Sequence, residues 1–135
     1  MGFSCIGVEY NPTLVYFLEK LKRAANKNFQ IVNSSIFDYL QQQPRQYEVV
    51  LALAVFHHYI KLESELHQLK NLLAHLNTRE LYFQPPRPSE VQMHNAHWNP
   101  SAEEFVAFIL EHSSLNQATL LGRQSSGRPI YRLTV

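Results

Sequence analysis

Two adjacent histidines, His57 and His58, follow the apolar run formed by residues 47–55. Imidazole titrates near neutral pH, so a histidine at the end of a strand can serve as a general base. Open α/β sheets bind ligands beyond the carboxyl ends of their strands, where we expect this pair to lie. The alternative is that one histidine caps the next helix while the other faces water. His57 and His58 are our candidate catalytic residues, with both interpretations open.

Glu9 is a second candidate, because it ends the short apolar run of residues 5–9. A carboxylate at the end of a strand can accept hydrogen bonds from both ribose hydroxyls of a nucleotide. Such an acid is also common as a solvated side chain in an ordinary strand-to-helix turn. The residue type alone does not choose between these interpretations, so the order of the surrounding elements must decide.

Metal binding and thiol chemistry are not indicated. His94 and His97 could supply two metal ligands, but no cysteine or cluster of acids lies beside them. Their segment is polar and flanked by proline, which is typical of a solvated loop, so we predict no metal site. The single cysteine, Cys5, excludes a disulfide framework. It begins an apolar run with no identifiable base beside it, and we expect a buried, unreactive thiol.

Strands and helices that alternate along the chain would position these residues. Asn11 and Pro12 predict a helix start, because asparagine is a favoured N-cap and proline fits the first helical position. Apolar residues at helical spacing follow: Leu14, Phe17, Leu18 and Leu21. A second strand is expected over residues 29–32. Residues 47–55 are apolar on both faces, which predicts a central strand covered by helices on both sides.

The next segments predict a leucine-rich helix over residues 62–76 and a strand over residues 81–84, which two prolines end. Asn99 and Pro100 predict another helix start. The buried face of that helix is expected to contain Phe105, Phe108 and Ile109.

The end of the chain predicts two strands, over residues 118–121 and 129–135. The connection over residues 122–127 is short, so they must form an antiparallel hairpin, because a parallel return needs a dozen residues or more. We interpret the three arginines of this hairpin as surface charges: Arg123, Arg128 and Arg132.

Length and charge limit the classes of function. The chain has 135 residues, with 12 lysines and arginines against 11 acids and a formal net charge of +1. We expect one domain, and the absence of a basic excess does not favour nucleic acid as a partner. No apolar run approaches the roughly 18 to 20 residues that cross a bilayer. We therefore expect a cytoplasmic protein without a membrane partner.

The order of the elements and three motifs resemble the class I S-adenosylmethionine-dependent methyltransferases. The motifs are VEYNP at residues 8–12, VFHH at residues 55–58 and GRPIYR at residues 127–132. The resemblance covers almost the whole chain, from what would be the second strand of the family. It implies an α/β fold with a three-layer Rossmann-like sheet, mostly parallel with a C-terminal antiparallel hairpin.

The resemblance also implies a cofactor and its contacts. Glu9 stands where an acid of the family binds the ribose hydroxyls of S-adenosylmethionine. Ser35 and Ile36 would face adenine, with Ser35 where the family usually has an aspartate that contacts the adenine amine. Ala54 would begin the segment that lines the path of the methyl group to a small-molecule acceptor. His57 and His58 would end that segment.

The sequence departs from the family before Glu9. The first strand and glycine-rich loop of the family should lie about 20 residues before the ribose acid, whereas only eight residues precede Glu9. Gly2 and Gly7 do not make that loop. Ser35 in place of the aspartate also loses a charge-assisted hydrogen bond. We therefore expect a single methyltransferase-like domain, residues 1–135, that is truncated at its N-terminal end.

A missing first strand would leave two edges unpaired that are central in the family's sheet. Either the strand that ends at Glu9 pairs directly with the strand over residues 47–55, or another chain fills the gap. Unpaired central edges with apolar faces are strong association sites. We therefore expect a homodimer, or a partner chain that completes the sheet.

Three functions remain for comparison with the structure. The first is a methyltransferase-like domain that is weak or inactive alone and whose cofactor would be S-adenosylmethionine. The second is a non-catalytic dimerising or interaction module that has lost cofactor binding. The third is a nicotinamide nucleotide enzyme, since Glu9 suits that role, but the antiparallel hairpin and the histidine pair argue against it.

Overall fold

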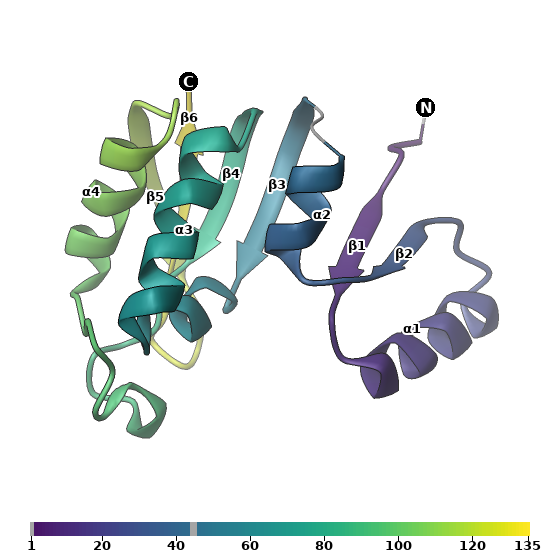
Figure 1. The fold of residues 1–135 in the computed structure, drawn as a ribbon, viewed down its shortest axis with the longest axis horizontal. Coiled ribbons are helices and arrows are strands. Elements are labelled where there is room, and N and C mark those ends of the chain that lie inside the picture. Colours follow the sequence, from purple (N-terminus) through teal and green to yellow (C-terminus); the bar gives the residue numbers. More distant parts are fainter. Residues whose placement is uncertain (1, 44–45) are drawn as a thin grey trace. The chain divides into compact units, whose positions relative to one another are not determined.

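A computed structural model describes residues 2–43 and 46–135 (Figure 1). These residues form two compact units, residues 2–43 and residues 46–135. In the described ranges, no helix is both long and apolar enough to span a membrane.

The first unit has a two-stranded parallel sheet and two helices. β1 (Ile6–Glu9) pairs with β2 (Gln30–Asn33), so that Glu9 lies opposite Asn33. Helix α1 (Pro12–Ala24) follows β1, and helix α2 (Ile36–Gln42) follows β2. The Asn33 side-chain amide donates hydrogen bonds of 2.9 Å to the carbonyls of Glu9 and Tyr10. These bonds hold the turn that follows β1.

Helix α1 begins as the sequence predicts. Asn11 is its N-cap, and the side-chain oxygen accepts the amide hydrogens of Thr13 at 2.9 Å and Leu14 at 3.4 Å. The apolar stripe is nevertheless open, since Phe17 is 54% exposed and Leu21 is 65% exposed. A two-stranded sheet offers little surface for a 13-residue helix to cover.

The expectation of a buried thiol at Cys5 is wrong. Strand β1 begins at Ile6, and Cys5 lies just before it with an exposed side chain. The Cys5 carbonyl accepts the Gln30 amide at 2.9 Å, so the backbone continues the strand direction. The thiol donates a hydrogen bond of 3.8 Å to the Phe3 carbonyl.

The second unit is built on a four-stranded sheet with the order β3-β4-β6-β5. β3 (Tyr47–Leu53) and β4 (Thr78–Gln84) are parallel. β6 (Pro129–Thr134) is antiparallel to both β4 and β5 (Gln117–Arg123). The predicted hairpin is thus confirmed, and its second strand lies inside the sheet. The described strands form two parallel and two antiparallel pairs, so the α/β fold has mixed sheets.

Two helices cover one face of this sheet. The short helix η1 (Phe56–Ile60) and helix α3 (Glu63–His75) connect β3 to β4, and α4 (Ala102–His112) precedes β5. Both α3 and α4 lie on the same face of the sheet (Figure 1). Fully buried apolar side chains between the helices and the sheet form the core: Leu69, Leu73, Leu81, Phe83, Phe105, Ile109 and Leu133. Burial of each contributes about 1.5–3 kcal/mol.

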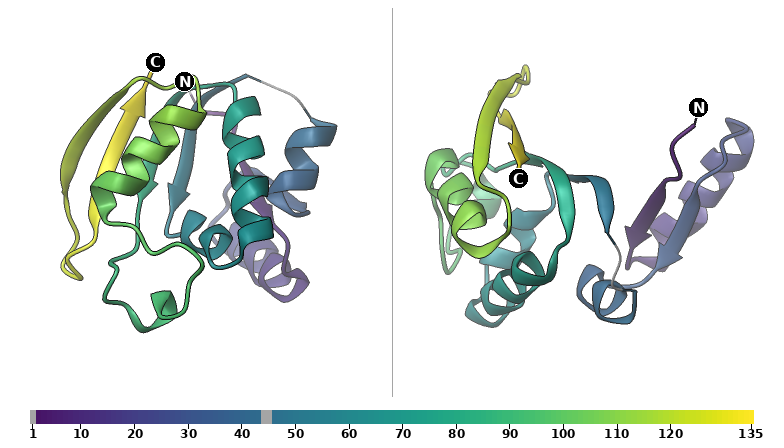
Figure 2. Two further views of the ribbon diagram at one scale, coloured as in Figure 1. Left: turned by 60° about the vertical axis from the view of Figure 1, so that its left-hand side comes forward. Right: turned by 90° about the horizontal axis from the view of Figure 1, so that it is seen from above.

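The other face of β3 is open. Val49, Leu51 and Leu53 alternate along the strand and are 45%, 65% and 43% exposed, whereas Ala52 on the opposite face is buried. Within the second unit, helices therefore cover only one face of β3, which differs from the predicted strand covered on both faces. The reason is that α3 and α4, which flank this sheet, lie on one side of it (Figure 2).

Helix α4 begins later than predicted. Ser101 is the N-cap, and its hydroxyl accepts the Glu104 amide at 3.1 Å while the Glu104 carboxylate accepts the Ser101 amide at 2.7 Å. In this capping box, each of the two residues satisfies one backbone amide of the other. The side chain of Asn99 instead donates to the Pro88 carbonyl at 3.0 Å. The predicted Asn-Pro start is therefore wrong, whereas the buried face with Phe105 is confirmed.

Candidate functional site

Several loops of the second unit gather at one end of its sheet. The carboxyl ends of β3 and β4, residues 85–100 with the short helix η2 (Val91–Met93), and the tip of the β5–β6 hairpin lie there (Figure 2). This is the end at which open α/β sheets bind ligands. The side chains that these segments contribute define the candidate site of this unit.

Strand β3 ends in a strained backbone conformation. Ala54 has a φ of 55°, in the left-handed region. A residue with a Cβ adopts that region at a cost of about 1–2 kcal/mol. The turn leads directly into η1, which carries His57 and His58. Strained residues of this kind cluster at functional sites, so the strain at Ala54 makes this turn a candidate part of the site.

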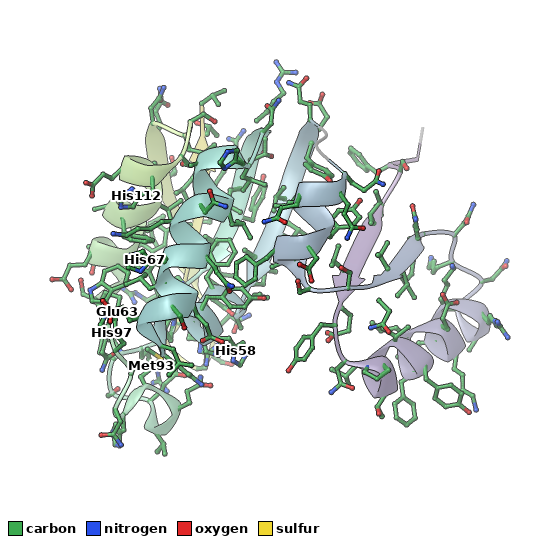
Figure 3. The ribbon with its side chains drawn as sticks, in the orientation of Figure 1. His58, Glu63, His67, Met93, His97 and His112 are labelled. Atoms are coloured by element: carbon green, nitrogen blue, oxygen red, sulfur yellow. The ribbon has the colours of Figure 1, made fainter. Side chains whose placement is uncertain are left out.

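His57 is buried, with 4% of its surface exposed, whereas His58 is exposed beyond the carboxyl end of β3 (Figure 3). The ring centroids are 4.0 Å apart. Burial, followed by His58 and the positive charges of Lys61 and Arg128, lowers the pKa of His57 to about 4. The pKa of His58 is also lowered, mainly by burial. His57 is therefore neutral at pH 7 and has a ring nitrogen that can accept a proton.

Two buried polar atoms at this end have no hydrogen-bond partner within the described chain. They are Nδ1 of His57 and Nε2 of Gln84, the last residue of β4. Only 4% of the Gln84 surface is exposed. A buried polar group without a partner costs about 1–3 kcal/mol. A ligand that supplied polar atoms at the ends of β3 and β4 would recover part of that cost.

Glu90, the residue before η2, accepts five hydrogen bonds. Arg128 donates through Nε at 2.8 Å and Nη2 at 2.5 Å. Arg87 donates through its backbone amide at 3.0 Å and Nε at 3.5 Å, and Gln92 donates at 2.6 Å. These bonds, led by those from Arg128, lower the pKa of Glu90 to about 2. Glu90 is therefore an ionised anchor that ties the hairpin to the loop after β4.

The interpretation of the hairpin arginines as surface charges is wrong for Arg128, whereas Arg132 is exposed as expected. The Arg128 side chain is only 17% exposed and binds Glu90. Arg132 donates to Glu80 across neighbouring strands, through Nε at 3.0 Å and Nη2 at 2.5 Å. Sequence reasoning missed both pairs because the partners are 38 and 52 residues apart, and such separations carry no local pattern.

In the first unit, Glu9 holds the turn between β1 and α1. Its Oε1 accepts the Asn11 amide at 2.8 Å, and the side chain is partly buried. Its Oε2 has no hydrogen bond to any described residue. One carboxylate oxygen thus has a structural role, and the other is available to a ligand.

Ser35 is the N-cap of α2. Its hydroxyl accepts the Asp38 amide at 3.1 Å and donates to Asp38 Oδ2 at 2.8 Å. Ile36, the next residue, is half-buried. A ligand that bonds to the Ser35 hydroxyl would compete with the helix cap, whereas an apolar contact with Ile36 would displace no hydrogen bond.

The other sequence candidates take structural positions. Within the described residues, no group of three or more His, Cys, Asp or Glu side chains is arranged to hold a metal ion. His97 lies after η2 (Figure 3), and its amide donates to the Lys61 carbonyl at 2.9 Å. Trp98 packs on Phe105 and Phe108, at 5.3 Å and 4.8 Å between centroids. Trp98 therefore belongs to the aromatic core.

Solved structures of similar fold include methyltransferases. They include the bifunctional kinase-methyltransferase WbdD, with a TM-score of 0.73 and 15% identity over 96% of this chain and 29% of that chain. The N-methyltransferase NodS from Bradyrhizobium japonicum WM9 has a TM-score of 0.65 and 11% identity over 97% of this chain and 72% of that chain. An rRNA methylase from Escherichia coli has a TM-score of 0.58 and 16% identity over 97% of this chain and 48% of that chain. The fold is methyltransferase-like.

This methyltransferase-like chain spans about 30% of the length of the WbdD chains that it matches. No family model matches the sequence, and no curated protein matches it. At 11% to 16% identity, the similarity to NodS and the rRNA methylase concerns the fold alone.

Proposed function

We propose that this chain is a methyltransferase-like domain, related to enzymes that move a methyl group from S-adenosylmethionine to a small acceptor, and that it is weak or inactive alone. The observation that carries the proposal is antiparallel β6 between β4 and β5, in a sheet whose parallel strand β3 ends in a histidine-bearing turn. The proposal includes a three-layer Rossmann-like arrangement and a cytoplasmic location. The methyltransferases of similar fold support the methyltransferase-like part of the proposal.

The ribose of S-adenosylmethionine is assigned to Glu9. The unpaired Oε2 at the carboxyl end of β1 supports this assignment, because it can accept a hydroxyl hydrogen without loss of the bond to Asn11. Ile36 is assigned to the adenine as an apolar contact. Ser35 is assigned to the adenine edge, where it would share its hydroxyl with the cap of α2.

The path of the methyl group is assigned to Ala54 and the residues that follow it in the second unit. The cofactor, when bound, supplies an electrophilic methyl group for in-line displacement, a reaction that depends mainly on positioning. His57 is a base candidate because its buried imidazole is neutral at pH 7 and Nδ1 has no partner among the described residues. His58 is a second, exposed candidate.

The methionine part of the cofactor finds no comparable cradle among the described residues. Close approach of the backbone needs glycine in a tight loop after a strand. Gly7 lies inside β1, and a Cβ there would meet only the Gln30 carbonyl oxygen at 3.9 Å, an ordinary contact. A Cβ at Gly2 would meet nothing within 4 Å. This partial fit supports weak or absent activity of the chain alone.

The sheet of the second unit is proposed to be completed by another strand, in a homodimer or by a partner chain. β3 pairs with β4 on one side only within the described residues. Val49, Leu51 and Leu53 on its open face are large and apolar. An open edge beside an apolar face is a strong association site. A strand with an attached helix would cover both features.

The second candidate function is a non-catalytic dimerising or interaction module that has lost cofactor binding. The open edge and apolar face of β3 favour it, together with the missing glycine cradle among the described residues. This candidate predicts association without any affinity for the cofactor.

Titration calorimetry with S-adenosylhomocysteine separates the two functions. The proposed domain should bind it at millimolar concentration or below, and Glu9→Gln should weaken binding by roughly tenfold, because a hydrogen bond to a charged group contributes about 1.5–3 kcal/mol. Glutamine retains an acceptor for the Asn11 amide, so the turn should persist. Glu19→Gln on α1 is the matched control and should bind as the parent does. No heat at millimolar ligand would leave the interaction module as the function.

A further inference from the structure

An open hollow lies beside the Glu90–Arg128 pair in the second unit. Its volume is about 480 Å³, and its lining includes Arg87, Ser89, Glu90, Gln124, Ser126 and Arg128. Ligand sites commonly enclose about 300–1,000 Å³. The hollow is formed by the loop after β4 and the tip of the β5–β6 hairpin, two segments that meet at the ligand-binding end of the sheet (Figure 2).

The hollow carries an excess of positive charge. Arg87 and Arg128 bring two guanidinium groups, and Glu90 brings the only carboxylate among its lining residues. Both oxygens of Glu90 already accept hydrogen bonds, so Glu90 balances one guanidinium and not both. The Arg87 side chain, which lines the hollow, is 49% exposed.

Several donors in the hollow are free within the described chain. The terminal nitrogens of Arg87 contact no described carboxylate, since only Nε reaches Glu90. The hydroxyls of Ser89 and Ser126 have no hydrogen-bond partner among the described residues. A planar guanidinium with two free nitrogens beside serine hydroxyls suits a carboxylate or a phosphate, which accept two parallel hydrogen bonds.

The hairpin turn lies beside the Arg87 side chain. Gly127 has a φ of 84°, and a Cβ at that position would lie 3.6 Å from Nη1 of Arg87. The guanidinium therefore lies against the bare backbone of the turn. Two backbone hydrogen bonds hold the turn. The Gly127 amide donates to the Gln124 carbonyl at 2.8 Å, and the Gln124 amide donates to the Arg128 carbonyl at 2.9 Å. Hydrogen bonds within the turn thus brace the hairpin side of the hollow, whereas Arg87 and Ser89 come from the loop after β4.

The hollow is also close to the candidate base. The charges of Arg128 and Glu90 both act on His57, which follows β3 at the same end of the sheet. A molecule anchored in the hollow by its anionic group would extend toward the ends of β3 and β4. The unpartnered atoms of His57 and Gln84 lie at those ends.

We propose that the hollow between Arg87 and Arg128 binds the anionic group, a carboxylate or a phosphate, of the acceptor molecule on which this domain acts. The role of acceptor rests on the proposed methyltransferase-like function. The binding of an anion in the hollow is independent of it. The acceptor would then be a small acidic molecule that is held at one end while its reactive group meets the turn after β3.

Two-dimensional NMR titration of the whole chain with inorganic phosphate and, in a separate arm, succinate tests the proposal at constant ionic strength. The amides of Ser89 and Ser126 should shift in a saturable way with at least one of the two anions. Arg87→Gln should weaken that binding at least tenfold. Arg79→Gln is the matched control, because Arg79 is an exposed arginine at the start of β4, where it pairs with Glu48. It should bind as the parent does.

The arms distinguish the possible results. Saturation by phosphate alone assigns a phosphorylated acceptor, and saturation by succinate alone assigns a carboxylate. Equal weakening by both arginine variants, or no saturable shift up to tens of millimolar, would overturn the proposal. If the anion binds in the hollow but S-adenosylhomocysteine does not bind the chain, the assignment to an acceptor is wrong. If S-adenosylhomocysteine binds and neither anion does, only the hollow is wrongly assigned.

Discussion

Arg128 and Glu90 form a two-point ion pair across 38 residues of chain, with Nε to Oε1 at 2.8 Å and Nη2 to Oε2 at 2.5 Å. The two side chains are 17% and 12% exposed. The pair joins the start of β6 to the loop after β4, so it holds together the end of the sheet where the candidate site lies. Its partial burial makes it stronger than an ordinary surface ion pair.

Glu90→Gln should lower the free energy of unfolding by about 1.5–3 kcal/mol at pH 7, the usual contribution of hydrogen bonds to a charged group. The pKa of Glu90 is about 2 in the folded chain, against an ordinary value of 4.5 that applies to the unfolded chain. The stabilisation is therefore complete above pH 4.5 and declines as the pH falls toward 2. Urea unfolding of both proteins over this range should show converging stabilities.

The control for this experiment is Glu111→Gln, since the Glu111 side chain is 75% exposed. Its effect should be close to zero, as is usual for surface charges. If the parent and Glu90→Gln curves stay parallel down to pH 2, the ion pair does not account for the stabilisation.

The second prediction concerns the protonation of His57. Its pKa of about 4 lies below the ordinary 6.5 because of burial, so the unfolded chain binds a proton between these values that the folded chain does not. Stability should therefore rise with pH from 4 to 6.5, by up to about 1.4 kcal/mol per pH unit from this group. His57→Gln should flatten the slope.

NMR titration of the histidine rings gives an independent measurement. The signal that disappears in His57→Gln should titrate near pH 4 in the parent protein. A midpoint near 6.5 would show that the ring is solvated, and the burial of His57 would then no longer support it as the base candidate.

The third prediction concerns the strained turn after β3. Ala54→Val should lower the free energy of unfolding by about 1–2 kcal/mol, because a β-branched residue fits poorly at a φ of 55°. Ala118→Val on the exposed strand β5 is the control and should change stability little, since valine suits a strand. Urea unfolding measures both. Equal effects would mean that the left-handed turn is not populated in solution.

The fourth prediction tests association through β3. Leu51 is 65% exposed on the open face of the strand. If β3 joins two copies, the parent chain should sediment as a dimer at micromolar concentration, and Leu51→Ser should shift it toward a monomer. Leu62→Ser, at a leucine that is 58% exposed before α3, should leave the dimer intact. A parent chain that remains monomeric would contradict the homodimer.

Local features of the fold follow from the sequence because neighbouring residues produce them. The Asn11 cap starts α1, and leucines at helical spacing predict α3 to within one residue at each end. The short connection predicts the β5–β6 hairpin, since no parallel return is that short. Glu9, Ala54 and His57 are also found at strand ends, as expected.

Only the tertiary structure decided which distant residues meet. It placed β6 between β4 and β5, paired Arg128 with Glu90, and left Leu51 uncovered because α3 and α4 share one face of the sheet. The sequence pattern of β3 shows that both faces of the strand are apolar, but it does not show whether helices cover each face. Contacts between residues far apart depend on strand order and helix placement, and these are settled by packing of the whole unit rather than by local spacing.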